Sequence, residues 1–137
     1  DYNNTQLVSQ IKKYKLENII LLLGIRRDIH VILKEIDLHI LPSNSEAFPN
    51  VVAEAMACGT PCVVTNVGDA RFIVGKTGWV APPNNSFLLS NSIKHALSEL
   101  GTKKWKSKSN SARLRIEKNF DIDDMINAYK IAWTKIL

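Results

Sequence analysis

The chain has 137 residues, of which 45% are hydrophobic and 23% charged, a size and composition typical of one soluble globular domain. This composition excludes a disordered tail, and the longest apolar run, near Ile19 to Leu23, is too short to cross a bilayer. The net charge of +5 is uneven, because residues 1–70 hold six Lys/Arg against eight Asp/Glu and residues 71–137 hold twelve against five.

The first half of the chain alternates helical patterns with short apolar runs. An amphipathic helix is predicted behind Thr5, with apolar positions at Leu7, Val8, Ile11 and Tyr14. The further predicted elements are a strand at 19–23, a helix at 27–35, a strand at 38–41, a helix from about 50 to 59 and a strand at 62–65. Short apolar strands that alternate with helices indicate a parallel sheet, because parallel strands are buried on both faces. The predicted fold class is therefore α/β.

The second half closes with helices. A turn between Gly75 and Gly78 leads to a last predicted strand at 79–81, and three helices follow without a strand between them. The first of these is expected to bury Leu89, Ile93, Ala96, Leu97 and Leu100, and the last to bury Ile122, Met125, Ile126, Tyr129, Trp133 and Ile136. Asp121 can cap the last helix.

The stretch 103–118 carries seven basic residues and one acidic residue. Such a stretch could bind anions, but we interpret it as the solvated face of a helix whose inward positions are Trp105, Ser109, Ala112 and Ile116. The two cysteines, Cys58 and Cys62, are too few for a disulfide scaffold and lack the second pair of a zinc ribbon, so both are expected to be reduced and buried.

The loop after Leu41 is the best candidate for a ligand site. In an open α/β sheet, ligands bind beyond the carboxyl ends of the strands, where loops lead into helices. Pro49 suits a first helical turn, which leaves the amides near Asn50, Val51 and Val52 unpaired by the helix and free to bind a phosphate.

Two carboxylates flank this predicted anion site, Glu46 before the helix and Glu54 within it. If the helix begins at Pro49, Glu54 lies roughly 7 Å along its axis. A carboxylate can accept two hydrogen bonds from a vicinal diol such as that of a ribose, and a phosphate between two diols describes a nucleotide sugar. The spacing fits equally well an alternative in which Glu46 caps the helix and Glu54 is a surface residue.

Glu46 and Glu54 form an E-x7-E motif, and residues 41–65 around it strongly resemble the C-terminal, donor-binding domain of family 4 retaining glycosyltransferases of the GT-B fold. Residues 23–29, 67–69 and 77–83 support the resemblance, which covers nearly the whole chain. It implies a Rossmann-like parallel sheet with flanking helices that ends in consecutive helices.

The resemblance also implies roles for the matching residues. Glu54 would hold the ribose hydroxyls of the donor, and Glu46 would be the catalytic residue, which orients the donor sugar and stabilises charge without being an established nucleophile. The resemblance further implies backbone contacts to the sugar, diphosphate and base from Ala47, Phe48, Pro49, Asn50, Val51, Ile25 and Arg26. The donor would be a UDP- or GDP-linked sugar, and no metal or other cofactor would be required.

Two departures from the family pattern affect these expectations. Ala47 stands where many relatives have Gly, and alanine restricts positive φ. Family members also carry upstream strands that clamp the diphosphate and an N-terminal acceptor-binding domain, on which the last helix commonly packs. Residues 1–137 are therefore expected to be a single partial domain that transfers no sugar alone and exposes an apolar stripe at 121–137.

The resemblance thus implies part of a hexosyltransferase-like enzyme that glycosylates a glycan or lipid-linked acceptor, in bacterial surface polysaccharide biosynthesis. A cytoplasmic location is expected, with peripheral contact at the inner face of the membrane as an option, and no nucleic acid partner. Two alternatives stay open, a non-catalytic nucleotide-sugar-binding module and a basic module that docks on membrane or nucleic acid through 103–118. Binding to anionic polymers that is sensitive to salt and survives the Glu54→Ala change would favour the basic module.

Overall fold

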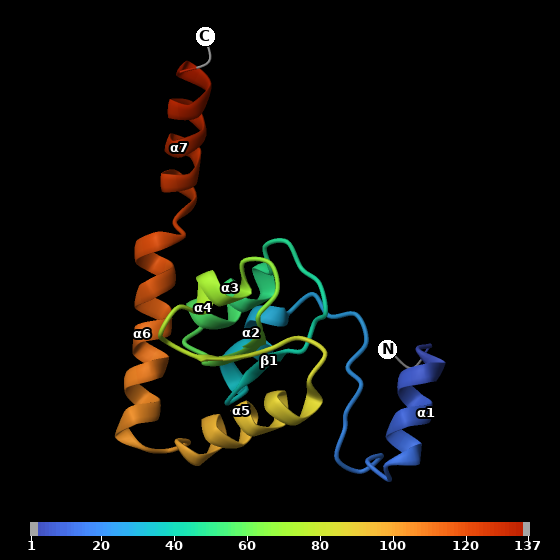
Figure 1. The fold of residues 1–137 in the computed structure, drawn as a ribbon. Coiled ribbons are helices and arrows are strands. Elements are labelled where there is room, and N and C mark those ends of the chain that lie inside the picture. The colour runs from blue at the N-terminus through green and yellow to red at the C-terminus, as the bar shows by residue number, and fades with distance from the viewer. Residues whose placement is uncertain (1–2, 136–137) are drawn as a thin grey trace.

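A computed structural model of the protein describes residues 3–135. In chain order its elements are α1 (Thr5–Lys13), α2 (Ile29–Glu35), β1 (His39–Leu41), α3 (Asn50–Ala57), β2 (Cys62–Thr65), α4 (Ala70–Val74), β3 (Trp79–Ala81), α5 (Ser86–Ser98), α6 (Lys103–Asn119) and α7 (Ile122–Thr134). Figure 1 shows this order from α1, which lies apart from the sheet, to α7, which projects from the end of α6. Within the described residues, no helix is long and apolar enough to span a membrane.

The three strands of the described chain form one parallel sheet in the order β1-β2-β3. Leu41 pairs with Val64 across β1 and β2, and Thr65 pairs with Ala81 across β2 and β3. Every residue of the central strand β2 is buried, as expected for a parallel strand covered on both faces. The predicted strands at 62–65 and 79–81 are confirmed, and β1 begins one residue later than predicted.

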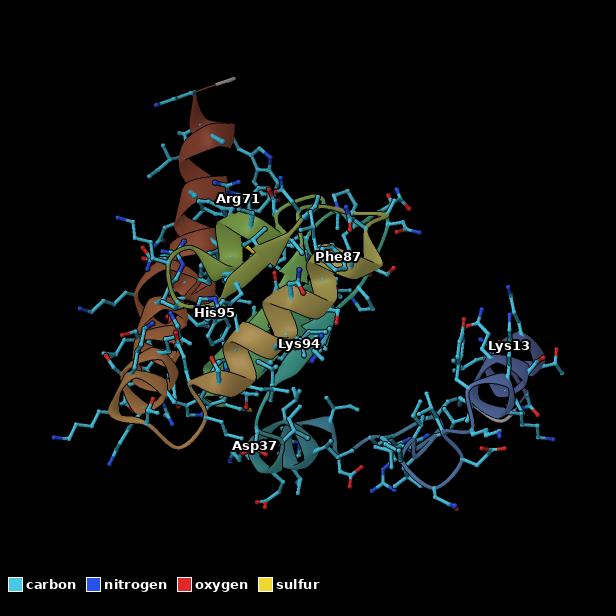
Figure 2. All side chains as sticks on the ribbon, turned by 60° about the horizontal axis from the view of Figure 1, so that its bottom comes forward. Lys13, Asp37, Arg71, Phe87, Lys94 and His95 are labelled. Atoms are coloured by element: carbon cyan, nitrogen blue, oxygen red, sulfur yellow. The ribbon has the colours of Figure 1, made fainter. Side chains whose placement is uncertain are left out.

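Helices cover both faces of the sheet. On one face, α2, α3, α4 and α6 enclose a core that includes Leu33, Leu41, Val52, Met56, Val64, Ile73 and Ala112. On the other face, α5 lies across the strands, where Val63, Trp79 and Ala96 form a second core with Leu38, Leu89, Ile93 and Trp105 at its edge. Figure 2 shows this helix with its labelled residues Phe87, Lys94 and His95.

The helix α6 packs alongside α3. Ala112 is fully buried between the two layers, and the Ser109 hydroxyl donates a hydrogen bond of 2.6 Å to the carbonyl of Gly59. Gly59 has a φ of +84°, the left-handed conformation that commonly ends a helix at glycine. The prediction that Trp105, Ser109, Ala112 and Ile116 face inward is therefore confirmed, since all four are buried or half-buried.

The predicted strand at 19–23 is wrong. Residues 14–28 form no strand or helix, and the side chains of Ile19 and Leu21 are 77% and 74% exposed. In Figure 1 this segment runs between α1 and α2 at a distance from the sheet. An apolar run becomes a strand only where a neighbouring strand takes up its backbone hydrogen bonds, and none of the described strands lies beside this segment.

Several helix predictions also need correction. The helix α2 begins at Ile29 instead of Arg27, and the short helix α4 was not predicted. The side chains of Leu97 in α5 and of Leu100, just past the end of α5, are exposed, although both were expected to face inward. Cys58 is half-exposed, whereas Cys62 is buried as predicted.

The helix α7 buries none of its described residues. Asp121 caps it as predicted, because its carboxylate accepts a hydrogen bond of 2.8 Å from the amide of Asp123. The residues expected to face inward, Ile122, Met125, Ile126, Tyr129 and Trp133, are all exposed, while Ile136 lies outside the described residues. The apolar stripe that these residues form is exposed, since α7 extends away from the rest of the described chain (Figure 1).

Candidate functional site

The loop from Pro42 to Pro49, here called the α3 loop, joins the carboxyl end of β1 to the start of α3. The end of β2 holds the beginning of this loop in place. The Thr65 hydroxyl lies 2.6 Å from the carbonyl oxygen of Ser43 and 3.2 Å from that of Leu41. The loop therefore lies at the carboxyl edge of the sheet, where ligands bind in open α/β folds.

Glu46 is half-buried in the α3 loop. The Ser43 hydroxyl donates a hydrogen bond of 2.7 Å to Oε1 of Glu46, which orients the carboxylate. The residue at the N-cap of α3 is Pro49, and the described residues provide no side-chain cap there. Glu46 therefore does not act as the helix cap, in contrast to the structural alternative considered from the sequence.

The start of α3 offers two unpaired amides where the sequence predicted three. The amide of Val52 donates a hydrogen bond of 3.0 Å to the carbonyl of Pro49, so it is already engaged. For the amides of Asn50 and Val51, the described residues provide no acceptor. A helix start with free amides carries partial positive charge and can bind an anion.

A second loop, residues 66–69, clamps the α3 loop. The amide of Asp69 donates a hydrogen bond of 2.8 Å to the carbonyl of Ala47. Gly68 has a φ of +47°, and a Cβ at this position would collide with the carbonyl oxygens of Glu46 and Ala47. Ala47 itself is not among the residues with positive φ, so the loop forms without the strain that its replacement of glycine could have caused.

Gly68 and Asp69 were not among the predicted site residues. A sequence signal for them exists, because a glycine three residues after a buried strand marks a loop at the same carboxyl edge of the sheet. What the sequence does not contain is the contact between this loop and the α3 loop, which lie about twenty residues apart in the chain.

Glu54 is exposed on α3 and borders a hollow of about 400 Å³. The residues that line it are Arg27, Ile29, His30, Leu33, Glu54, Ala57 and Cys58. Arg27, which was not a predicted site residue, thus lines the same hollow as Glu54. The predicted base-contacting residues Ile25 and Arg26 directly precede Arg27 but do not line this hollow.

The segment before α2 has its own local order. Ile25 is 94% exposed, and the Arg26 guanidinium forms two hydrogen bonds to the carboxylate of Asp28, of 2.8 and 2.6 Å. This pair raises the pKa of Arg26 and lowers that of Asp28, mainly through the hydrogen bonds between the side chains. A bidentate ion pair thus lies on either side of Arg27, the residue that lines the hollow beside Glu54.

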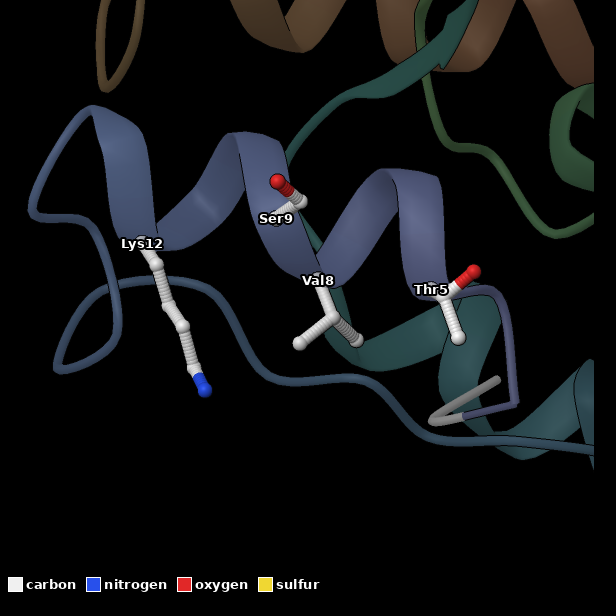
Figure 3. Close-up of a pocket in the computed structure, with 4 residues that line it drawn as sticks. All are labelled: Thr5, Val8, Ser9 and Lys12. Carbon is white, nitrogen blue, oxygen red and sulfur yellow. The ribbon is translucent and has the colours of Figure 1, made fainter.

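Four further hollows of the described surface are lined by residues other than the predicted site residues. The one on α1, shown in Figure 3, has a volume of about 320 Å³ and is lined by Thr5, Val8, Ser9 and Lys12. Among residues 3–135, no group of three or more His, Cys, Asp and Glu side chains is arranged to hold a metal ion. The roles of Glu46, Glu54 and their neighbours stay predictions at this point.

The fold is similar to that of solved glycosyltransferases. A glycosyltransferase from Rickettsia africae is 29% identical with a TM-score of 0.89, over 98% of this chain and 36% of that chain. HepE of Anabaena, solved in complex with UDP, is 28% identical with a TM-score of 0.87, over 96% of this chain and 36% of that chain. The small parallel sheet of this chain, with its flanking helices and its consecutive helices at the end, matches the Rossmann-like C-terminal lobe of GT-B glycosyltransferases.

Residues 2–115 match the model of the family described as glycosyl transferases group 1, and the chain belongs to this family. O-antigen chain mannosyltransferase B of Escherichia coli is 34% identical over 96 residues, which cover 67% of this chain and 24% of that protein. The chain therefore spans about a quarter of this curated relative and about a third of the two solved structures.

Proposed function

We propose that residues 1–137 form a single partial domain that binds the nucleotide-sugar donor of a retaining glycosyltransferase. The observation that carries this proposal is the α3 loop, which holds the half-buried carboxylate of Glu46 and leads directly into the two free amides of Asn50 and Val51. The UDP complex of HepE supports a nucleotide-linked sugar as the donor, and the nucleotide in this proposal is UDP or GDP.

Each part of the site has a distinct task in this proposal. The amides of Asn50 and Val51, together with the positive end of the α3 dipole, receive the donor diphosphate. The Glu46 carboxylate, oriented by Ser43, accepts hydrogen bonds from sugar hydroxyls and stabilises the positive charge that develops on the ring as the diphosphate leaves. Glu54 accepts two hydrogen bonds from the ribose.

The remaining predicted contacts come from backbone groups. The backbone of Ala47, Phe48 and Pro49 contacts the sugar and diphosphate, and that of Ile25 and Arg26 contacts the base. No metal is assigned a role. The wider proposal places acceptor binding on another part of the full protein, so residues 1–137 transfer no sugar alone. The acceptor is a glycan or lipid-linked saccharide of bacterial surface polysaccharide, glycosylated in the cytoplasm or at the inner face of the membrane.

Calorimetric titration of the chain with UDP- and GDP-linked sugars tests this proposal. The Glu54→Ala change removes the charged acceptor of the ribose hydrogen bonds, a loss of about 1.5–3 kcal/mol in total at this exposed position, so affinity should fall by roughly 10- to 100-fold. Glu35→Ala is the matched control, because Glu35 is also exposed but lies at the end of α2, outside the hollow beside Glu54. Equal affinities of the two variants would refute the proposed ribose contact.

A non-catalytic module with the same donor site is separated from an enzyme by a second measurement. The protein that contains this chain together with an acceptor domain should transfer the sugar, and the Glu46→Gln change should slow transfer while free nucleotide binding stays unchanged. Glutamine keeps an oxygen for the Ser43 hydroxyl but removes the charge. Donor binding without transfer by the full protein would support the non-catalytic alternative.

The basic stretch 103–118 is less suited to docking than its charge indicates. Lys104 forms an ion pair with Glu99 and Arg113 with Glu117. The Lys108 ammonium lies 4.8 Å from the centre of the Trp79 ring, and Arg115 donates to backbone carbonyls of α4. Four of the seven basic side chains therefore already have partners within the described protein, which favours a structural role for this helix.

A further inference from the structure

Three phenylalanine rings meet where α6 ends and the α3 loop begins to turn into α3. The ring of Phe120, the first of the two residues between α6 and α7, lies 6.0 Å from that of Phe48 and 5.7 Å from that of Phe72, between ring centres. The second contact is edge-to-face, with an angle of 74°. These three residues, here called the Phe cluster, connect the α3 loop, α4 and the end of α6.

The side chain of Arg115 packs against two rings of the Phe cluster, Phe72 and Phe120. Its guanidinium donates hydrogen bonds of 2.8 and 2.6 Å to the carbonyls of Ile73 and Phe72, which lie at the end of α4 and would otherwise lack donors. The same guanidinium lies 5.9 and 5.8 Å from the ring centres of Phe72 and Phe120. A Cβ at Gly75 would meet this guanidinium, so the glycine leaves the space that Arg115 occupies.

The end of α6 is a firm support for the loop because α6 is anchored along its length. Ser109 binds the carbonyl of Gly59 just past α3, and Ala112 is fully buried in the core. The α3 loop itself is held on its other side by the hydrogen bond from Asp69 to Ala47. In the described part of the chain, Phe120 is the ring that Phe48 contacts.

We propose that Phe120 is a positioning residue of the donor site. Its ring holds Phe48, and Phe48 is two residues from Glu46, so the contact keeps Glu46 and Ala47 in the conformation that receives the donor sugar. This inference rests on the proposed function. Phe120 does not touch the donor in this arrangement, and its effect falls on the sugar end of the ligand, since the ribose end is held by Glu54 on α3.

The test compares UDP-glucose with UDP, and GDP-mannose with GDP as a second pair, in calorimetric titrations of the full chain. An aromatic pair contributes about 0.5–1.5 kcal/mol beyond its buried area, which corresponds to about two- to tenfold in affinity. The Phe120→Ala change should weaken binding of the nucleotide sugar by this factor and change binding of the free nucleotide much less. The Phe120→Tyr change, which keeps the ring, should leave the affinity for the nucleotide sugar close to that of the wild-type chain.

Phe87→Ala is the matched control, because Phe87 is 72% exposed on α5, where Figure 2 labels it, and is not among the rings that contact the Phe cluster. If the Phe120→Ala variant does not fold, the same affinities are measured with Phe120→Leu, because leucine keeps apolar volume but has no ring. Equal weakening of nucleotide sugar and nucleotide, or wild-type affinity for both, would overturn the positioning role. Failure of the wild-type chain to bind any of the four probes would instead refute the proposed function and this inference with it.

Discussion

Replacing Gly68 by alanine should destabilise the protein through a collision at the α3 loop. Gly68 has a φ of +47°, and an added Cβ would strike the carbonyl oxygens of Glu46 and Ala47. Because these are backbone atoms, neither can rotate away, and the two loops must separate by about 1 Å to restore ordinary contact. That movement breaks the hydrogen bond of 2.8 Å from the Asp69 amide to Ala47.

The magnitude follows from two contributions. Left-handed backbone at alanine costs about 1–2 kcal/mol, and the lost hydrogen bond costs about 0.5–1.5 kcal/mol, so the free energy of unfolding should fall by about 1.5–3.5 kcal/mol. Gly101→Ala is the matched control, because Gly101 has a φ of +76° with no atom within 4 Å of the added Cβ. The two variants share the backbone strain and the change in the unfolded chain, so their difference isolates the collision.

Urea unfolding followed by circular dichroism measures this difference directly. Gly68→Ala should be less stable than Gly101→Ala by about 1 kcal/mol, which is roughly 4 °C in Tm for a chain of this length. It should also weaken UDP-glucose binding, which Gly101→Ala should leave unchanged. Equal stability of the two variants would refute the claim that the second loop clamps the α3 loop.

Three further predictions concern the rest of the fold. Ser109→Ala removes the hydrogen bond that ties α6 to the end of α3 and should cost about 1 kcal/mol in urea unfolding, a result contradicted by wild-type stability. The hydrogen bond from Lys104 lowers the pKa of Glu99, so this pair stabilises the fold above the ordinary carboxyl pKa, and its contribution is lost as the pH falls. The Lys104→Met change should therefore flatten the dependence of the free energy of unfolding on pH between about pH 3 and 6. Burial raises the pKa of Cys62 to about 12, so iodoacetamide at pH 8 should modify Cys58 in the native protein and Cys62 only after unfolding, as mass spectrometry would reveal.

The parts of the fold that local pattern determines were predictable. The strand at 62–65 is a continuous apolar run that follows Gly-Thr-Pro, and its burial on both faces needs no knowledge of its neighbours. The start of α7 was predictable because Asp121 is a capping residue followed by two further acids. Both features are encoded within a few consecutive residues.

The predictions that were wrong concern features that a few consecutive residues do not determine. The run at 19–23 has the composition of a strand, but whether it pairs depends on which strand lies beside it. The helix α4 has five residues, too few for a helical period to emerge. The burial of α7 was predicted from its apolar spacing alone, which shows that one face is apolar but does not show what covers it.

Some features of the candidate site follow from local sequence, and others depend on contacts between distant segments. The sequence places Glu46 and Glu54 on either side of a helix start, because their spacing along one segment carries that information. It cannot show that Gly68 packs on the α3 loop or that Phe120 meets Phe48, since these contacts join segments about 20 and 70 residues apart. Such contacts arise only when the sheet and its helices are assembled.

Only two residues, Phe120 and Asp121, join α6 to α7, so the C-terminal helix is attached through a short joint. With 13 residues at 1.5 Å each, α7 is a lever arm about 20 Å long, and its pivot is Phe120. A rotation of about 10° at the pivot corresponds to a displacement of about 3.5 Å at the far end of α7, so the arm reduces a large movement at its tip to a small one at the ring. The joint at the base of α7 therefore contains the ring that contacts Phe48 of the α3 loop, so the attachment point of the exposed helix and the loop share one aromatic contact.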